Sequence, residues 1–341
     1  MLYCFILMSI VIKTTGYITT LLDNEQFNPS CLDVSRLNEG ILTFSSGLDV
    51  FDMSLGTASI QQIGKFEQNL PSSSASITAM LSLSTVDSTR AILVAIHSFN
   101  QDYNPDKNNG VWLMFPGVLE KTNNSWIKVF PKNTEKPIFI TSLVQNGNLF
   151  YASDAAGYNI WWFDLKGGSD YLAGLGKKSY PKYYYSGVDS NTVQNIPEFN
   201  QGGKGPGVSS LLLIQLNGEV HIVFTNYGSG LSAIGQISSD GKSFVETPIA
   251  FNKKMFQYTY TGTTYSNDGF MYVGVGINLS SGTAGSSIIK TKLGSSNVTF
   301  IKDSRIGLVT DLKYTQNGLL FITLGSSLTE RRGRIMTYRE D

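Results

Sequence analysis

The sequence is poor in cysteine and histidine, and this scarcity excludes several kinds of site. It has 341 residues with two cysteines and two histidines. Loss of Cys4 with a leader would leave Cys31 alone and exclude a disulfide framework, so stability must come from a hydrophobic core. Cys31 is interpreted as a small buried residue rather than a nucleophile. His97 and His221 are interpreted as partly buried strand residues, with a catalytic base as the alternative.

An excess of charge of one sign is also missing. The chain carries 26 basic and 26 acidic residues and has no basic cluster, which argues against nucleic acid as the main partner. No G-x-S-x-G elbow occurs, and no glycine-rich segment follows a strand and opens a helix, as a phosphate-binding loop does. Helical periodicity is hard to find anywhere in the chain. These absences leave an all-β protein without a common catalytic motif.

A long hydrophobic run is absent as well. LYCFILMSIVI near the N-terminus has about a dozen apolar residues, too few to span a bilayer but suited to the core of a signal peptide. We predict a signal peptide over 1–16, followed by a secreted mature chain with no membrane span; the alternative is a buried first strand. Three Asn-x-Ser/Thr triplets agree with secretion and predict glycosylation at Asn123, Asn278 and Asn297.

What the chain does contain is a repeated β unit, which is clearest from Lys136 to Asp164. There IFITSLV is β-branched and apolar, Asn146-Gly147 suits a tight hairpin turn with positive φ, and the strands NLFYASD and NIWWFDL follow. Trp161 and Trp162 are interpreted as one core and one rim residue. Because a lone hairpin cannot bury its apolar face, copies of such a unit must stack on one another.

Six copies of the central hairpin can be found, and the turn glycines Gly218, Gly269 and Gly318 are spaced by 51 and 49 residues. This period is typical of a propeller blade. The sequence therefore predicts a single all-β domain over 17–341, a six-bladed β-propeller of four-stranded antiparallel blades. The N-terminal segment 16–24 would complete the last blade and remove exposed edges. The expected innermost strands are 31–36, 75–83, 138–144, 208–216, 258–265 and 308–315.

A long insertion at 176–207 interrupts the repeats and contains Tyr183, Tyr184 and Tyr185. Connections of this length inside compact domains are usually functional or disordered. The insertion is either a lid over the channel mouth that brings these tyrosines to a ligand, or a solvated excursion that packs them on the blade rim.

The fourth and fifth units, GVSSLLLIQLNGEVHIVFTNYGSGLSAIGQISSDGKSFVETPI and TYSNDGFMYVGVG, resemble six-bladed propellers of the gluconolactonase and senescence-marker type. NGNLFYASDAAGYNIWWFDLKGG is similar to the same family's strand, Asp-containing loop and strand. The pattern of the repeats is most similar to that of secreted fungal propellers, some of them encoded near secondary-metabolite gene clusters. This resemblance implies a role accessory to secondary metabolism. The resemblance covers about 40–341 and implies the fold more than the function.

The enzymes of that family hold a divalent cation, usually calcium, through Glu, Asn and Asp side chains in the channel. The resemblance implies that Asp33 and Asp311, taken to lie early on their inner strands, could act as metal ligands, while Glu39 belongs to a turn. Ring closure would place the two aspartates side by side, where they repel unless a cation or a proton lies between them. The other inner strands carry mostly hydroxyls, namely Ser142, Ser209, Ser210 and Thr261.

These residues support two functions. Hydroxyls bind neutral ligands well and hold a hard cation poorly, which favours a secreted binding propeller that takes a small molecule or a partner protein at its channel mouth. The alternative is a calcium-dependent hydrolase of a lactone or ester, in which the metal polarises the carbonyl and activates a water. Bound calcium would separate the two.

Overall fold

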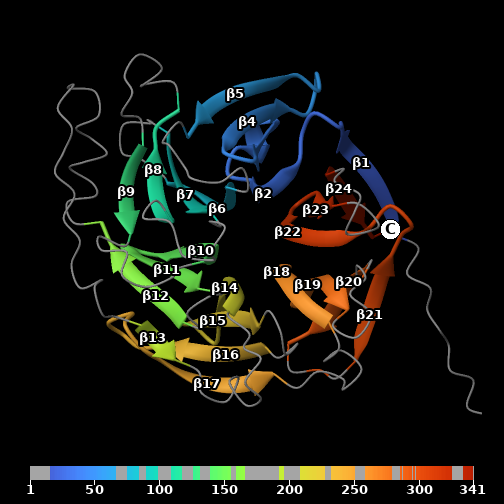
Figure 1. Ribbon diagram of the computed structural model, residues 1–341. Coiled ribbons are helices and arrows are strands. Elements are labelled where there is room, and N and C mark those ends of the chain that lie inside the picture. The colour runs from blue at the N-terminus through green and yellow to red at the C-terminus, as the bar shows by residue number, and fades with distance from the viewer. Residues whose placement is uncertain are drawn as a thin grey trace, which may run out of the picture.

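The computed structural model is nearly all β and forms a six-bladed β-propeller (Figure 1). Six four-stranded antiparallel sheets are arranged around a central axis, as the sequence predicts. Within the described residues, the one helical element is the single-turn 3₁₀ helix η1 (Leu37–Glu39). The structure describes residues 16–66, 75–83, 90–98, 109–116, 126–130, 139–154, 159–165, 192–195, 208–226, 232–249, 258–278, 285, 287–293, 295, 297–324 and 333–340.

Blades one to three are meanders whose strands pair in chain order, with the innermost strand first. Blade one is β2 (Pro29–Asp33), β3 (Ile41–Ser46), β4 (Asp49–Ser54) and β5 (Ile60–Lys65). Blade two is β6 (Ser76–Leu83), β7 (Ala91–His97), β8 (Gly110–Met114) and β9 (Trp126–Phe130). Blade three is β10 (Ile140–Asn146), β11 (Leu149–Asp154), β12 (Asn159–Asp164) and β13 (Thr192–Asn195).

Blades four and five follow the same order, and blade six takes its outer strand from the N-terminus. Blade four is β14 (Val208–Leu216), β15 (Glu219–Asn226), β16 (Ser232–Ile237) and β17 (Phe244–Ile249). Blade five is β18 (Tyr258–Tyr265), β19 (Phe270–Asn278), β20 (Ser287–Lys292) and β21 (Val298–Lys302). Blade six is β22 (Leu308–Thr315), β23 (Gly318–Leu324), β24 (Arg334–Arg339) and β1 (Tyr17–Asp23).

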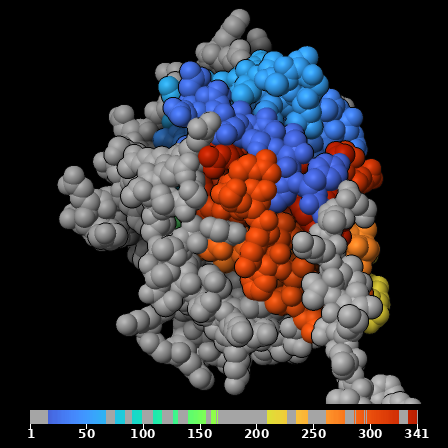
Figure 2. All heavy atoms as spheres, turned by 90° about the vertical axis from the view of Figure 1, so that its right-hand side faces the viewer, coloured from blue at the N-terminus to red at the C-terminus, as the bar shows by residue number. Residues whose placement is uncertain are grey.

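The ring is closed by β1, which pairs antiparallel with β24 from Tyr17 opposite Arg339 to Asp23 opposite Arg334. Figure 2 shows the blue N-terminal residues lying directly on the red and orange residues of the last blades. Arg305 secures this strand by donating from Nη2 to the carbonyl of Ile18 at 3.0 Å. The predicted closure by the N-terminal segment is confirmed, and it covers the edge that β24 would otherwise expose.

The hydrophobic core is divided into six clusters, each between two neighbouring blades. Both faces of every blade are therefore buried. Trp161 packs toward blade two and Trp162 toward blade four, and both are at most 9% exposed. The prediction that one of these tryptophans lies on the rim is wrong, because successive strand residues point to opposite faces and each face meets a neighbour.

Three local predictions need correction. Asn217 and Gly218 both have positive φ, as a type I′ hairpin turn requires, but between β10 and β11 only Gly147 does and the turn is Gly147-Asn148. The first inner strand ends at Asp33 rather than at residue 36, because the chain then turns into η1. Part of the segment predicted as an insertion, Thr192–Asn195, pairs with β12 as the outer strand of blade three.

Candidate functional site: the central channel

The inner strands surround a narrow polar channel on the propeller axis. Its cavity volume is about 20 Å³, which gives room for roughly one or two water molecules. Strands β6, β10, β14, β18 and β22 each contribute at least one hydroxyl. The lining residues with polar side chains are Thr78, Thr141, Ser142, Ser210, Thr261, Thr263, Thr310, Asp311 and Lys313.

Many of these hydroxyls join adjacent inner strands. Thr78 Oγ1 donates to the Ile140 carbonyl of the next blade at 2.5 Å. Ser142 Oγ accepts from the Leu211 amide at 3.1 Å, and Thr261 Oγ1 donates to the Val309 carbonyl. Because inner strands are edge strands with unpaired backbone groups facing the channel, such bonds satisfy groups that would otherwise need water.

The four hydroxyls predicted to bind ligand therefore differ in their surroundings. Ser142 and Thr261 are engaged between blades, and Ser209 is bonded within blade four to Thr225 Oγ1 at 2.9 Å. Ser210 is buried and lines the channel. The structure thus places two of these four side chains, Ser142 and Thr261, in hydrogen bonds between blades and a third, Ser209, in a bond within its own blade.

Two further hydroxyls that the sequence reasoning missed are the ones left without partners. Thr263 Oγ1 and Thr310 Oγ1 line the channel, are buried, and have no hydrogen-bond partner among the described residues. A buried hydroxyl without a partner is costly, so these two atoms mark where a bound molecule can bond. Their signal in the sequence is the repetition of threonine in TYTGTTY and LVTDLKYT, of which only Thr261 had been singled out.

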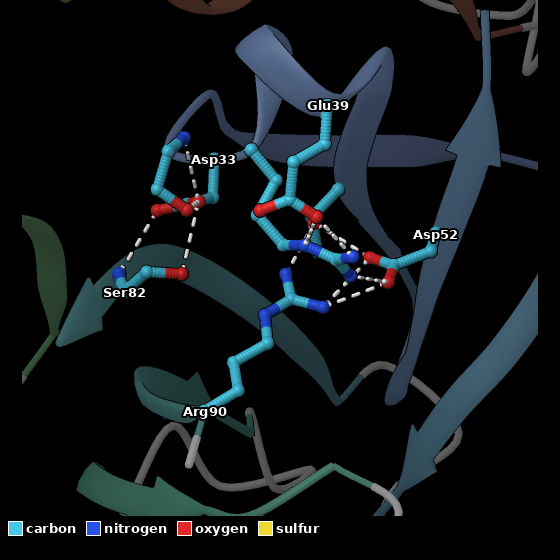
Figure 3. Close-up of polar contacts among 8 residues, drawn as sticks. Asp33, Glu39, Asp52, Ser82 and Arg90 are labelled. Atoms are coloured by element: carbon cyan, nitrogen blue, oxygen red, sulfur yellow. Dashed lines mark hydrogen bonds and ion pairs between the residues drawn. The ribbon is translucent and has the colours of Figure 1, made fainter. Parts of the chain in front are cut away.

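Asp33 is the last residue of β2, not an early one, and its carboxylate points to blade two (Figure 3). Oδ1 accepts from Ser35 Oγ at 2.5 Å, from the Ser35 amide at 3.1 Å and from Ser82 Oγ at 2.9 Å. Oδ2 accepts from the Ser82 amide at 2.9 Å. With four donors on one buried carboxylate, Asp33 ties β2 to β6.

Asp311 joins β22 to β2, on the side of β2 opposite to the one that Asp33 joins to β6. Its Oδ2 accepts from the Leu32 amide at 2.8 Å, and its Oδ1 accepts from the Leu312 amide at 2.8 Å. Lys313, two residues further along β22, places its Nζ 3.4 Å from Asp311 Oδ1. The positive charge that the two aspartates were expected to need is thus supplied by a side chain that the sequence reasoning missed.

The charge state of Lys313 follows from its neighbours. Burial by itself lowers the pKa of this ammonium, but the carboxylates of Asp311 and Asp33 outweigh burial and raise the pKa above its ordinary value. Lys313 is therefore a permanent cation near neutral pH. It lines the channel with 34% of its side chain exposed.

The donor set of the channel does not fit a calcium ion. Calcium takes six to eight oxygen ligands, mostly from carboxylates and carbonyls. Of the described residues, Asp311 is the one carboxylate that lines the channel, and it stands beside an ammonium. No group of three or more His, Cys, Asp or Glu side chains suited to a metal occurs in the described part of the chain.

A second polar cluster joins blades one and two (Figure 3). Arg90 donates from Nη1 to both oxygens of Asp52 at 2.7 and 3.0 Å, and Arg36 reaches the same carboxylate at 3.0 Å. Arg36 also pairs with Glu39, which lies in the η1 turn as predicted. Two cations balance two anions here, so the cluster is a structural link.

The remaining candidate groups are engaged in the core. The Cys31 thiol is 1% exposed and hydrogen-bonded to Ser45, and burial together with Asp311 raises its pKa, so it is an inert thiol at neutral pH. His97 is buried, bonded to Asn109 and stacked on Phe139 at 4.1 Å. His221 is half-buried, with Nδ1 at 3.2 Å from the Glu219 carbonyl. Both histidines lie on strands, as expected, and each ring has a protein partner.

Other predicted site residues lie partly outside the described part of the chain. Tyr183, Tyr184 and Tyr185, with Asn123, are outside it, as is the side chain of Asn278. Asn297 is exposed, just before β21. The described residues contain no helix with the length and apolar character needed to cross a bilayer.

Comparison with known proteins gives a likeness in fold alone. No protein-family model matches the chain, and no curated protein matches its sequence. The PQQ-bound aldose sugar dehydrogenase of Streptomyces coelicolor matches with a TM-score of 0.57 and 11% identity over 96% of this chain and 99% of that one. The apo aldose sugar dehydrogenase of Escherichia coli gives 0.55 and 12%, covering 96% and 100%.

A β-propeller domain that is not named as a dehydrogenase is similar to a comparable extent. The Cps50 (Swd1) β-propeller domain of Myceliophteria thermophila matches with a TM-score of 0.51 and 9% identity over 94% of this chain and 99% of that one. At such identities the likeness establishes a β-propeller and says nothing about activity. The class defined by fold and channel is thus the six-bladed β-propeller with a hydroxyl-lined axis. The comparisons do not show membership of the gluconolactonase-type family.

Proposed function

We propose that the protein is a secreted binding propeller whose channel holds part of a small, neutral molecule that carries hydroxyl or carbonyl oxygens. The observation that carries this proposal is the pair of buried, unpartnered hydroxyls of Thr263 and Thr310 inside the polar channel. A hydroxyl can donate to or accept from an uncharged oxygen without a change of charge. Lys313 adds ammonium donors at the same place.

The size of the channel restricts how the ligand binds. Room for roughly one or two waters admits a single hydroxymethyl or carbonyl group, so the body of the ligand would lie at the channel mouth. Sugars and their lactones have this shape and chemistry. Two structural neighbours are named sugar dehydrogenases, which supports testing sugars first.

The two catalytic alternatives find less support in the channel. A calcium-dependent hydrolase would need several free oxygen ligands, whereas both aspartate carboxylates already accept from protein donors. PQQ, bound by one neighbour, is a quinone with three carboxylates, and the described channel offers it one ammonium that is paired with Asp311. The lining residues do not fit that group, so no step is assigned to it.

Titration calorimetry with a panel of neutral sugars, polyols and aldonolactones tests the proposal. The matching aldonates, which carry a carboxylate, serve as charged comparison ligands. We expect a neutral member to bind and Thr263→Val to weaken that binding by about two- to tenfold, the value of one hydrogen bond. Because Thr263 Oγ1 has no protein partner, the same change should leave the melting temperature unchanged or slightly higher.

The matched control for this measurement is Thr19→Val, on an exposed position of the outer strand β1, which should leave binding unchanged. Equal affinity in Thr263→Val and the wild type, or no binding by any neutral member of the panel, would refute a channel site for such ligands.

Secretion is the second part of the proposal and has its own test. The first described strand starts at Tyr17, so cleavage after Gly16 would leave β1 whole, and the exposed Asn297 is accessible to a glycosyltransferase. Intact-mass and N-terminal analysis of protein from a secreting eukaryotic host should show a chain that begins near Tyr17 and loses mass on glycan removal. A chain that retains Met1 and carries no glycan would contradict export.

A further inference from the structure

Asp311 is a carboxylate at the centre of the ring whose two oxygens both have protein donors. The amides of Leu32 and Leu312 lie 2.8 Å from Oδ2 and Oδ1, respectively, and the ammonium of Lys313 lies 3.4 Å from Oδ1. The Leu32 amide belongs to blade one, so this carboxylate also spans the joint between blades six and one. A second carboxylate, Asp33, follows Leu32 directly and contributes to the same electrostatic environment.

Lys313 is placed to balance this negative charge. Residues two apart on a strand project to the same face, and Lys313 follows Asp311 by two on β22. Its ammonium has three donors, and the ion pair with Asp311 uses one of them. The side chain also lines the channel.

We propose that Lys313 is the built-in cation of the channel and excludes a divalent metal ion from the position beside Asp311. A metal ion at Asp311 would lie within a few ångströms of a fixed positive charge and would have to displace the ammonium from its carboxylate. The channel then selects uncharged oxygen acceptors over metal ions. This inference does not depend on which molecule the channel binds, so it stands or fails apart from the proposed function.

Melting curves of the full mature chain with calcium, manganese or a chelator test the inference. The wild type should melt at the same temperature in all three. Lys313→Met keeps a stem of similar length and removes the charged end, so Asp311 loses its counter-ion. This variant should melt lower in chelator and regain part of that stability as calcium rises, logarithmically with concentration, although a single carboxylate makes the site a weak one.

Two further variants keep the test decisive. Lys65→Met removes an exposed lysine from the outer strand β5 and should be as indifferent to metal as the wild type. Asp311→Asn combined with Lys313→Met removes both charges; it should fold and ignore calcium even if the single Lys313→Met variant is insoluble.

Either of two results would overturn the inference. One is a wild type that calcium stabilises, because the ammonium then leaves room for a metal. The other is loss of stability in the double variant equal to the sum of the two single losses, because Lys313 and Asp311 then act independently.

Discussion

Replacement of Asp33 by alanine is expected to lower the free energy of unfolding by about 3 to 5 kcal/mol. This carboxylate is 7% exposed and accepts four hydrogen bonds from the amides and hydroxyls of Ser35 and Ser82. Truncation leaves those donors with no acceptor at the joint between blades one and two. Hydrogen bonds to a charged acceptor are worth about 1.5 to 3 kcal/mol each, and bonds in one network do not add fully.

Urea unfolding followed by tryptophan fluorescence measures this loss of unfolding free energy. Three comparisons show whether the lost hydrogen bonds cause it. Asp33→Asn keeps one acceptor oxygen and should fall between the wild type and Asp33→Ala. Asp240→Ala, in an exposed turn of blade four, should leave the unfolding curve nearly unchanged. The loss in Asp33→Ala should also be the same with calcium and with chelator; a loss that appears only in calcium would make Asp33 a metal ligand instead.

Leu22→Asp is expected to have an effect of similar size, about 4 kcal/mol or more, because it places a carboxylate in an apolar interface. Leu22 is 8% exposed on β1 and packs in the cluster that joins blades six and one, together with Leu42, Leu320 and Ile335. If β1 detaches, the outer edge of β24 is exposed and can pair with other chains.

Size-exclusion chromatography with light scattering, alongside urea unfolding, should show this variant as destabilised and prone to associate. Thr19→Asp introduces the same charge at an exposed position of the same strand and should remain a stable monodisperse protein like the wild type. If Leu22→Asp unfolds at the same urea concentration as the wild type, the apolar contacts of β1 do not hold the ring closed.

The blades themselves could be predicted from the sequence because their information is local. Inner strands at 208–216, 258–265 and 308–315 have the predicted bounds, since a turn glycine and an apolar run of strand length specify each hairpin. Closure by β1 could also be predicted, since an open ring would leave two unpaired edges. The predicted end of the first inner strand, residue 36, is wrong because the chain leaves β2 at Asp33 and turns into η1.

The contacts of the site were decided by the tertiary structure alone. Ser82 meets Asp33 and Leu32 meets Asp311 only because neighbouring blades turn about a common axis by a fixed amount, and no strand encodes that angle. The same geometry satisfies Thr261 and leaves Thr263 without a partner, although both are threonines of one strand. The sequence by itself determined how many blades form and where the chain closes. Which polar groups bond each other, and which remain for a ligand, depends on distances across the ring that only the closed propeller sets.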